Sequence, residues 1–208
     1  MPLLIQFTVG SKQKTKNGLK KLAQHIKNQI TISKESLGIV VSKFEEKHYK
    51  KREHLLEFDK KSNYEYFITK GCVRTYILDY NGVEHNLFFS IENWWTGDLQ
   101  SFMNKTPATY NIQALEDTLV LSINRANWNF LLEEVPEFLK YSHRLFQKSI
   151  IALQNRTIQN LSFTAKHRYE HFIEHYPELV QRIPQKHIAS YIGITAEFLS
   201  MLRNQKNK

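Results

Sequence analysis

Three histidines and a glutamate recur at helical spacing in the last quarter of the chain. His167, His171 and His175 are four residues apart, and His171 to His175 matches the H-x-x-E-H pattern of inverted zinc proteases, with Glu174 as its glutamate. Two histidines one turn apart can bind zinc, and a neighbouring glutamate can act as a general base. The residues after His175 are taken up by Pro177 and a further helical pattern, which leaves no downstream carboxylate to complete such a site. A solvated polar helix face is therefore favoured, and a zinc hydrolase is an alternative.

A second pattern follows at residues 185–204, which read QKHIASYIGITAEFLSMLRN. Its apolar residues lie at helical spacing, with a small residue, Ala189, where two helices would cross. Gly193 can end the first helix because glycine adopts a left-handed conformation without a Cβ clash, and Thr195 can cap the next helix. The apolar positions are Ile188, Ile192, Ile194, Leu199 and Leu202. This combination predicts a helix-turn-helix.

In a helix-turn-helix the second helix lies in the major groove of DNA, with its N-terminal part against the bases. Glu197 can accept a hydrogen bond from a cytosine amino group, Arg203 can contact guanine or phosphate, and Met201 offers an apolar contact. Residues at the two helix N-termini suit phosphate. The candidate DNA-binding residues are Gln185, Lys186, Thr195, Ala196, Glu197, Ser200, Met201, Arg203 and Asn204.

These helices need elements to position them, and the preceding chain supplies both helical and strand patterns. Residues 19–31 and 35–47 have helical spacing, with Ser33 as a plausible N-cap of the second segment. From His54 the period changes to two, in β-branched and aromatic runs that extend to about residue 123. Asn81-Gly82 between two of these runs predicts a hairpin with a type I′ turn. Short, closely spaced strands indicate a sandwich, roll or barrel.

A long helix is predicted after Pro136, which suits the first turn of a helix. Apolar residues at 3.5-residue spacing form a narrow seam, which His143 and Thr157 interrupt. A helix of about 26 residues would span about 39 Å, more than a small domain needs to cover itself. We therefore expect it to meet a second copy of the chain, although packing on its own domain is an alternative. The seam residues proposed to form the dimer are Leu139, Phe146, Ile150, Leu153 and Thr157.

Composition and charge restrict the class of protein. The chain has 208 residues with a net charge of +9, 41% hydrophobic residues and one cysteine. These values exclude global disorder, a disulfide framework and a Cys-ligated zinc or iron–sulfur site. Residues 1–61 carry a net charge of +8, residues 62–136 carry −5 and residues 137–208 carry +6. Basic segments beside helical patterns suggest a nucleic acid or another anionic surface as partner.

Taken together, these parts resemble the cyclic-AMP receptor protein/Fnr family of bacterial transcription regulators. The resemblance covers about residues 19–208 and rests on the order of the parts, including YFITKGCVRTYI, the helix after Pro136 and RIPQKHIASYIGITAEFLSMLR. It implies a roll that binds an effector, a helix that forms a homodimer and a helix-turn-helix that binds a palindromic operator.

The resemblance also implies an effector site. The family's phosphate-binding cassette opens with Gly-Glu-Leu and ends with Arg and Ser or Thr, and here these positions fall on Gly97-Asp98-Leu99 and on Ala108-Thr109. Without the arginine, a cyclic phosphate has no bidentate partner, so cyclic AMP is not the expected effector. Trp95 can pack the roll or line a pocket. The candidate effector-site residues are Trp95, Gly97, Asp98, Leu99, Ala108 and Thr109.

We therefore predict an α+β chain. Its parts are a basic flexible tail (1–18), a cyclic-nucleotide-binding-like β-roll, that is, a double-stranded β-helix or jelly roll, with flanking helices (19–134), a dimerisation helix (135–163) and a helix-turn-helix domain (164–208). The expected function is homodimeric, sequence-specific transcription regulation on double-stranded DNA in the cytoplasm, with an unknown small-molecule effector. No enzymatic activity, cofactor, metal or membrane partner is expected. A sensor that signals through protein contacts without binding DNA is the alternative.

Overall fold

The computed structural model describes residues 4–206, and the side chains of residues 16–204. The chain forms two compact units. The first comprises the residues up to Val73 together with Ser90–Leu145, and the second comprises Arg74–Phe89 together with the residues from Phe146 onward. Residues 74–89 thus group with the C-terminal helices, whereas we predicted them within a roll over 19–134.

The first unit contains a β-roll with helices before and after it. One sheet has the strand order β1-β8-β3-β6, and in it β8 pairs antiparallel with both β1 and β3. Strand β2 pairs antiparallel with β7 in a second sheet. The strands of this unit are β1 (Glu45–Tyr49), β2 (His54–Leu56), β3 (Tyr64–Lys70), β6 (Trp95–Thr96), β7 (Asn111–Ala114) and β8 (Thr118–Asn124). Its helices are α1 (Leu4–Gln29), α2 (Lys34–Ser42), α3 (Leu99–Asn104) and α4 (Arg125–Glu134).

The basic tail expected over residues 1–18 differs from the structure. Residues 4–18 continue the helix that the apolar spacing predicts from Leu19, and residues 1–3 lie outside the described residues. The segment SKQKTKN contains no proline, and Lys and Gln have good helix propensity, so the helix can extend through it. The buried face of α1 is the predicted one, since Leu22 and Ile26 are fully buried.

The second predicted helix, 35–47, ends earlier than expected. Helix α2 stops at Ser42, and residues 45–49 form β1 at the edge of the first sheet, paired with β8. The Ser33 cap is confirmed, because its hydroxyl accepts a hydrogen bond from the Ser36 amide at 3.0 Å. The strand escapes prediction because the run EEKHY is charged and only partly buried, and its pairing with β8 is a long-range contact.

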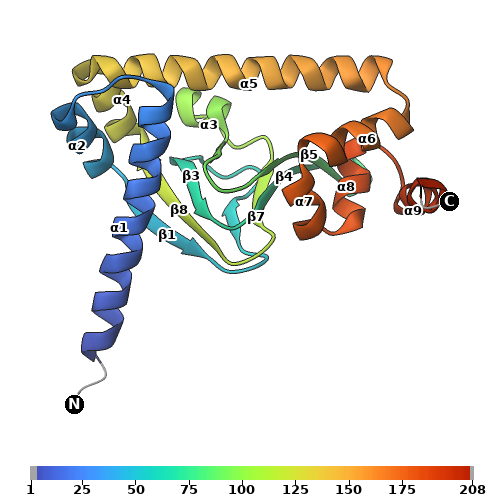
Figure 1. Ribbon diagram of the computed structural model, residues 1–208, viewed down its shortest axis with the longest axis horizontal. Coiled ribbons are helices and arrows are strands. Elements are labelled where there is room, and N and C mark those ends of the chain that lie inside the picture. The colour runs from blue at the N-terminus through green and yellow to red at the C-terminus, as the bar shows by residue number, and fades with distance from the viewer. Residues whose placement is uncertain (1–3, 207–208) are drawn as a thin grey trace. The chain divides into compact units, whose positions relative to one another are not determined.

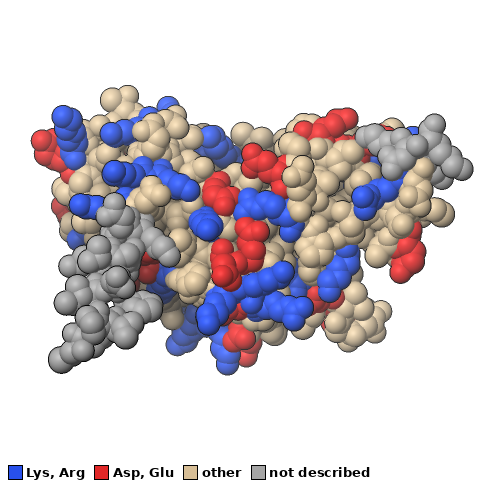
Figure 2. Space-filling model, turned by 60° about the horizontal axis from the view of Figure 1, so that its bottom comes forward, with Lys and Arg blue, Asp and Glu red and all other residues tan. Residues whose placement is uncertain are grey.

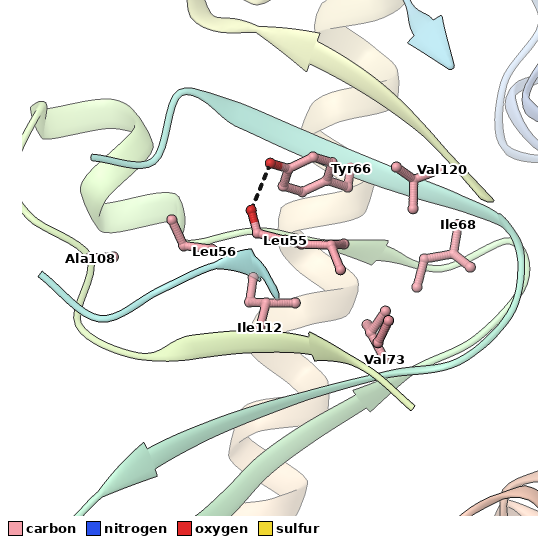
Figure 3. Packing of buried hydrophobic residues seen from close by; sticks show 9 residues of the cluster. Leu55, Leu56, Tyr66, Ile68, Val73, Ala108, Ile112 and Val120 are labelled. Atoms are coloured by element: carbon pink, nitrogen blue, oxygen red, sulfur yellow. Dashed lines mark hydrogen bonds between the residues drawn. The ribbon is translucent and has the colours of Figure 1, made fainter. Parts of the chain in front are cut away.

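The core of the roll is apolar and closely packed (Figure 3). Tyr66 is 4% exposed, and its hydroxyl donates a hydrogen bond to the Leu55 carbonyl at 3.1 Å, which satisfies the one polar group that it brings into the core. Tyr49, Tyr64 and Tyr110 pack against this cluster from its margin. The buried members are Leu55, Leu56, Tyr66, Ile68, Val73, Ala108, Ile112, Ala114 and Val120.

The second unit contains the strands β4 (Val73–Leu78) and β5 (Glu84–Ser90), except for the terminal Val73 and Ser90, and four helices. The hairpin predicted at Asn81-Gly82 is present, but the turn type is different. Only Gly82 has a positive φ (79°), and the Gly82 amide bonds to the Asp79 carbonyl at 2.9 Å. This agrees with a type I turn followed by a left-handed residue, and the Asp79 carboxylate stabilises it by accepting from the amides of Asn81 and Val83. The four helices are α6 (Ala165–His175), α7 (Pro177–Arg182), α8 (Gln185–Ile192) and α9 (Ala196–Lys206).

Helix α5 (Pro136–Ser162) is one unbroken helix of 27 residues, and it begins at the predicted proline (Figure 1). Its residues up to Leu145 belong to the first unit and the remainder to the second. Among residues 4–206, each helix is either too short or too polar to traverse a lipid bilayer.

Candidate functional site

Helices α8 and α9 form the predicted helix-turn-helix, and Gly193 makes the turn. Gly193 has φ 79° and ψ 41°, the left-handed conformation that glycine adopts without strain. The Ile194 amide bonds back to the Ala189 carbonyl at 3.0 Å, and the Gly193 amide bonds to the Ser190 carbonyl at 3.2 Å. These bonds satisfy the carbonyls at the end of α8 and redirect the chain into α9 within three residues.

The inner face of the pair is buried as the sequence pattern requires. Ile188, Ala189 and Ile192 on α8 and Leu199 on α9 are each at most 3% exposed. Ala189 is 1% exposed, so a longer side chain at this position would have to enter the packed interior of the unit. The packing fixes which side of α9 is turned away from the unit.

The opposite side of α9 is exposed. The Thr195 hydroxyl caps the helix by accepting from the Phe198 amide at 3.2 Å, as predicted. Hydrogen bonds from its own backbone amide and from the Thr195 side chain hold the pKa of Glu197 below its usual range, so Glu197 is ionised at neutral pH. The exposed predicted residues are Thr195, Ala196, Glu197, Ser200, Met201, Arg203 and Asn204.

The start of α8 differs from the start of α9. Lys186 is exposed there, whereas Gln185 is half-buried with its side-chain oxygen buried and without a protein partner. Pro184 occupies the N-cap position and no side chain caps the helix. Lys186 can therefore reach a phosphate directly, and Gln185 is less accessible than we expected.

The β4–β5 hairpin holds α8 through β5. The Ser190 hydroxyl donates to the Glu84 carbonyl at 3.0 Å and accepts from the Asn86 amide at 3.0 Å. A side chain of α8 thus continues the hydrogen bonding of the strand edge. No sequence pattern indicates this contact, because Ser190 and Glu84 are 106 residues apart.

A buried arginine organises the same contact. Arg74 on β4 is 4% exposed and makes a bidentate ion pair with Glu84, with Nη2 to Oε1 at 3.0 Å. Its Nη1 also lies 3.2 Å from His187 Nδ1 on α8. Burial, together with the charges of Arg74 and Lys186, lowers the pKa of His187 to about 4, with Glu84 opposing them. His187 is therefore neutral at pH 7.

Arg156, on the part of α5 that belongs to this unit, fixes the end of α8. Its Nη2 donates to the Tyr191 carbonyl at 3.4 Å and to the Asn86 carbonyl at 3.2 Å, and its guanidinium lies 4.1 Å from the centre of the Tyr191 ring. Burial lowers the pKa of Arg156, although the group stays charged at neutral pH. Arg156 and Arg74 are positioning groups that sequence reasoning did not identify.

The histidines of α6 do not assemble a metal site. The rings of His171 and His175 are stacked with centroids 3.7 Å apart, and His175 Nδ1 donates to the His171 carbonyl at 2.9 Å. Within the described part of the chain, no group of three or more His, Cys, Asp or Glu side chains could hold a metal ion. The arrangement therefore gives no support to the zinc hydrolase alternative.

In the first unit, Asp98 is buried and bonded to the protein itself. It caps α3 by accepting from the Ser101 amide at 3.0 Å, and its second oxygen accepts from the Thr109 amide at 2.8 Å and the Thr109 hydroxyl at 3.0 Å. The side chain is 1% exposed. Asp98 thereby joins the two ends of the segment 97–109.

Glu65 on β3 lies directly over Gly97. A Cβ added to Gly97 would overlap the Glu65 carboxyl group, so a side chain at this position would displace Glu65. Glu65 is 8% exposed, and its Oε1 is buried without a protein partner. Burial, with a smaller effect of Asp98, raises the pKa of Glu65 to about 8. The residue gave no signal in the sequence, because it lies in a strand that is buried on both faces.

The sequence of the roll is similar to that of a known domain family. Residues 46–135 match the family model of the cyclic nucleotide-binding domain. The chain contains a cyclic nucleotide-binding domain. This domain corresponds to the predicted β-roll, whereas no curated protein matches the sequence.

Solved structures extend the likeness beyond this domain. FixK2 from Bradyrhizobium japonicum has 20% identity and a TM-score of 0.66, over 78% of this chain and 83% of that one. A CooA mutant from Carboxydothermus hydrogenoformans has 23% identity and a TM-score of 0.61, over 86% and 80%. A transcriptional regulator of the Crp/Fnr family from Eubacterium rectale has 15% identity and a TM-score of 0.64, over 84% and 83%. The chain therefore has the fold of Crp/Fnr regulators: a cyclic nucleotide-binding roll, a long helix and a C-terminal helix-turn-helix.

The segment 97–109 of the roll contains few groups that could hold a cyclic phosphate. The segment 97–109 contains one cation, the exposed Lys105. Ala108, at the position that the resemblance assigns to the phosphate-binding arginine, is 2% exposed and belongs to the apolar core. The nearby Glu65 carboxyl is buried. The segment itself therefore offers a cyclic phosphate no buried cation that could offset the cost of its desolvation.

Of the other candidate effector residues, Trp95 takes part in the packing of the roll, whereas Leu99 does not. The Trp95 indole donates to the Tyr141 hydroxyl at 2.9 Å and packs edge-on against Trp128, while Leu99 is 42% exposed. A shallow hollow of about 480 Å³ lies elsewhere, at β2, and contains none of the six candidates. Its lining residues are Glu53, His54, Leu55, Leu56, Glu57, Lys60 and Lys61. An effector site at the six residues stays a prediction.

Proposed function

We propose that this protein is a homodimeric, sequence-specific DNA-binding regulator of transcription that acts in the cytoplasm. The observation that carries the proposal is the α8–Gly193–α9 geometry, in which Leu199 anchors α9 and the opposite side of α9 is exposed. A helix presented in this way can enter the major groove of duplex DNA. The likeness to regulators of the Crp/Fnr fold supports the same function.

Charge supports DNA as the partner, although it does not locate the interface. Residues 137–208 carry 11 Lys and Arg against 5 Asp and Glu, a net charge of +6. On the face drawn in Figure 2, basic and acidic side chains are interspersed and form no continuous basic surface. Contacts to phosphate do not read sequence, so we assign specificity to the exposed side of α9.

A second copy of the chain would cover the apolar residues of α5. Leu139, Ile150 and Leu153 of the predicted seam are each more than half exposed, and so are Ile151 and Ile158. We name these five residues the α5 stripe. A concentration of exposed apolar side chains on one helix is typical of an interaction surface. Packing against the same stripe of a second copy buries it with two-fold symmetry, which matches a palindromic operator.

We further propose that the roll senses an unknown small molecule or none, and that this ligand is not cyclic AMP. The poor fit of the segment 97–109 to a cyclic phosphate supports this. Isothermal titration with cyclic AMP is expected to show no binding at millimolar concentration. Saturable binding by the full-length chain would contradict this part of the proposal.

The DNA-binding proposal is tested with the full-length protein and labelled promoter fragments at two salt concentrations. We expect selective binding of some fragments, which weakens steeply as salt rises because Lys and Arg release counterions from DNA. The variant Arg203→Ala should lower specific affinity by about 1–3 kcal/mol. Lys166→Ala is the matched control, because it removes one exposed charge from α6, outside the helix-turn-helix.

The two variants separate specific from general electrostatic effects. Equal losses in Arg203→Ala and Lys166→Ala would show that Arg203 acts only through net charge. Absence of binding to every fragment at low salt would refute the proposal. Such a result, combined with a ligand-dependent rise in melting temperature, would favour a sensor that signals through protein contacts.

A further inference from the structure

The exposed side of α9 has an unusual chemical composition at its centre. With about 100° between successive residues of a helix, four side chains fall within an arc of about 100° on the side opposite Leu199 and Leu202. We name this arc the central ridge; it consists of Glu197, Ser200, Met201 and Asn204. All four are exposed, whereas Leu199 is 1% exposed.

The central ridge contains no cation. Glu197 is an ionised carboxylate, Ser200 and Asn204 are neutral, and Arg203 lies on the flank of α9. The bidentate contact of an arginine with guanine is therefore not available at the centre of the helix. The ridge instead offers a hydrogen-bond acceptor at Glu197 and, one turn further, an apolar side chain at Met201.

Met201 is 52% exposed and is the one apolar side chain of the central ridge, so it is available to an apolar group of a partner. The one apolar feature of base edges in the major groove is the C5-methyl group of thymine. An unbranched thioether with three rotatable bonds can reach such a methyl group and adapt to it. Phe198 is also exposed, at 40%, but it lies about 60° outside Met201, beyond the edge of the ridge.

We propose that Met201 is a specificity-determining residue that selects a thymine in each half-site through its C5-methyl group. This inference rests on the proposed DNA-binding function, and it names thymine as the base that Met201 contacts. Glu197, one turn before Met201, accepts from an exocyclic amino group of a neighbouring base pair.

The experiment starts with selection of preferred duplexes from a random library by the full-length protein. Each thymine of the selected site is then replaced by deoxyuridine, which removes the methyl group and leaves base pairing intact. At one position of each half-site we expect affinity to fall about fourfold, the effect of one buried methyl group, and about 15-fold when both half-sites are changed. Met201→Gln should bind the thymine and deoxyuridine duplexes equally well.

Met201→Leu is the matched control, because leucine keeps an apolar contact and should retain the preference for thymine. Phe198→Ala should also retain it. A deoxyuridine effect of the same size in Met201→Gln as in the unaltered protein, or none at any position, would overturn the inference and leave the proposed function in place. If selection enriches no sequence at all, the proposed function fails, and this inference fails with it.

Discussion

The neutral histidine between β4 and α8 makes the stability of the C-terminal unit depend on pH. Two donors, Arg74 Nη1 at 3.2 Å and Asn86 Nδ2 at 3.4 Å, face His187 Nδ1. Since neither group can accept a hydrogen bond from a protonated ring, Nδ1 must be the acceptor and the proton resides on Nε2. Protonating Nδ1 would place a new N–H against a buried guanidinium.

The size of the effect follows from linkage. The pKa of His187 is lowered from 6.5 to about 4. A group whose pKa is lower in the folded state stabilises that state above its unfolded pKa and loses this contribution as pH falls toward the folded pKa. Between pH 7 and pH 5 the loss amounts to about 2 kcal/mol. Glu84, whose pKa is held below its usual range mainly by the hydrogen bond from Arg74, begins to contribute only at lower pH.

The assay is native-state hydrogen exchange of the amides of Gln185–Ile192, corrected for the pH dependence of intrinsic exchange. In the unaltered protein, the free energy of opening of α8 should fall by about 2 kcal/mol from pH 7 to pH 5. The matched variant His187→Gln keeps an acceptor for Arg74 but does not titrate, so its free energy of opening should stay nearly constant. Parallel losses in both proteins, or a rise toward pH 5, would refute the reasoning.

Three further predictions concern other parts of the chain. Burial raises the pKa of Glu65 to about 8, so the first unit should lose about 2 kcal/mol of stability from pH 5 to pH 7, whereas the Glu65→Gln variant should not. Urea unfolding at both pH values measures this, and equal losses in the unaltered protein and the variant would show that Glu65 is solvated. Gly193→Ala should destabilise the second unit by about 1 kcal/mol, because Gly193 has a positive φ. Gly38→Ala should stabilise the first unit by about 0.5–1 kcal/mol, because Gly38 lies in α2 and no atom is near an added Cβ. If both variants raised the melting temperature, or both lowered it, the reasoning would be contradicted. Leu153→Glu should produce monomers in sedimentation, whereas Ala152→Glu, at an exposed position on the other side of α5, should not; a dimer in both, or in neither, would exclude the α5 stripe as the interface.

Features that depend on a few neighbouring residues were predictable from the sequence. The Ser33 cap, the helix start at Pro136, the turn at Gly193 and the cap at Thr195 all involve side-chain or backbone bonds that span at most five residues. The period of apolar residues likewise identified the buried faces of α1, α8 and α9. The fold class followed from the order of these elements.

Features that depend on distant residues were not predictable. The charged strand β1 exists because β8, more than sixty residues later in the chain, pairs with it. Glu65 lies over Gly97, and Arg74 contacts His187. In both cases the two residues are more than thirty positions apart in the chain. A single sequence gives periodicity and local chemistry, but it does not show which buried charges meet.

The bonding of Ser190 to both Glu84 and Asn86 has a practical consequence for chimaeric proteins. A designer who joins the C-terminal helices of this chain to another regulator would ordinarily cut once, near the end of the long helix. That cut would separate α8 from β5 and leave the Ser190 hydroxyl without its hydrogen bonds to Glu84 and Asn86. A functional graft has to carry two separate stretches of the gene, Arg74–Phe89 and the residues from Phe146 onward.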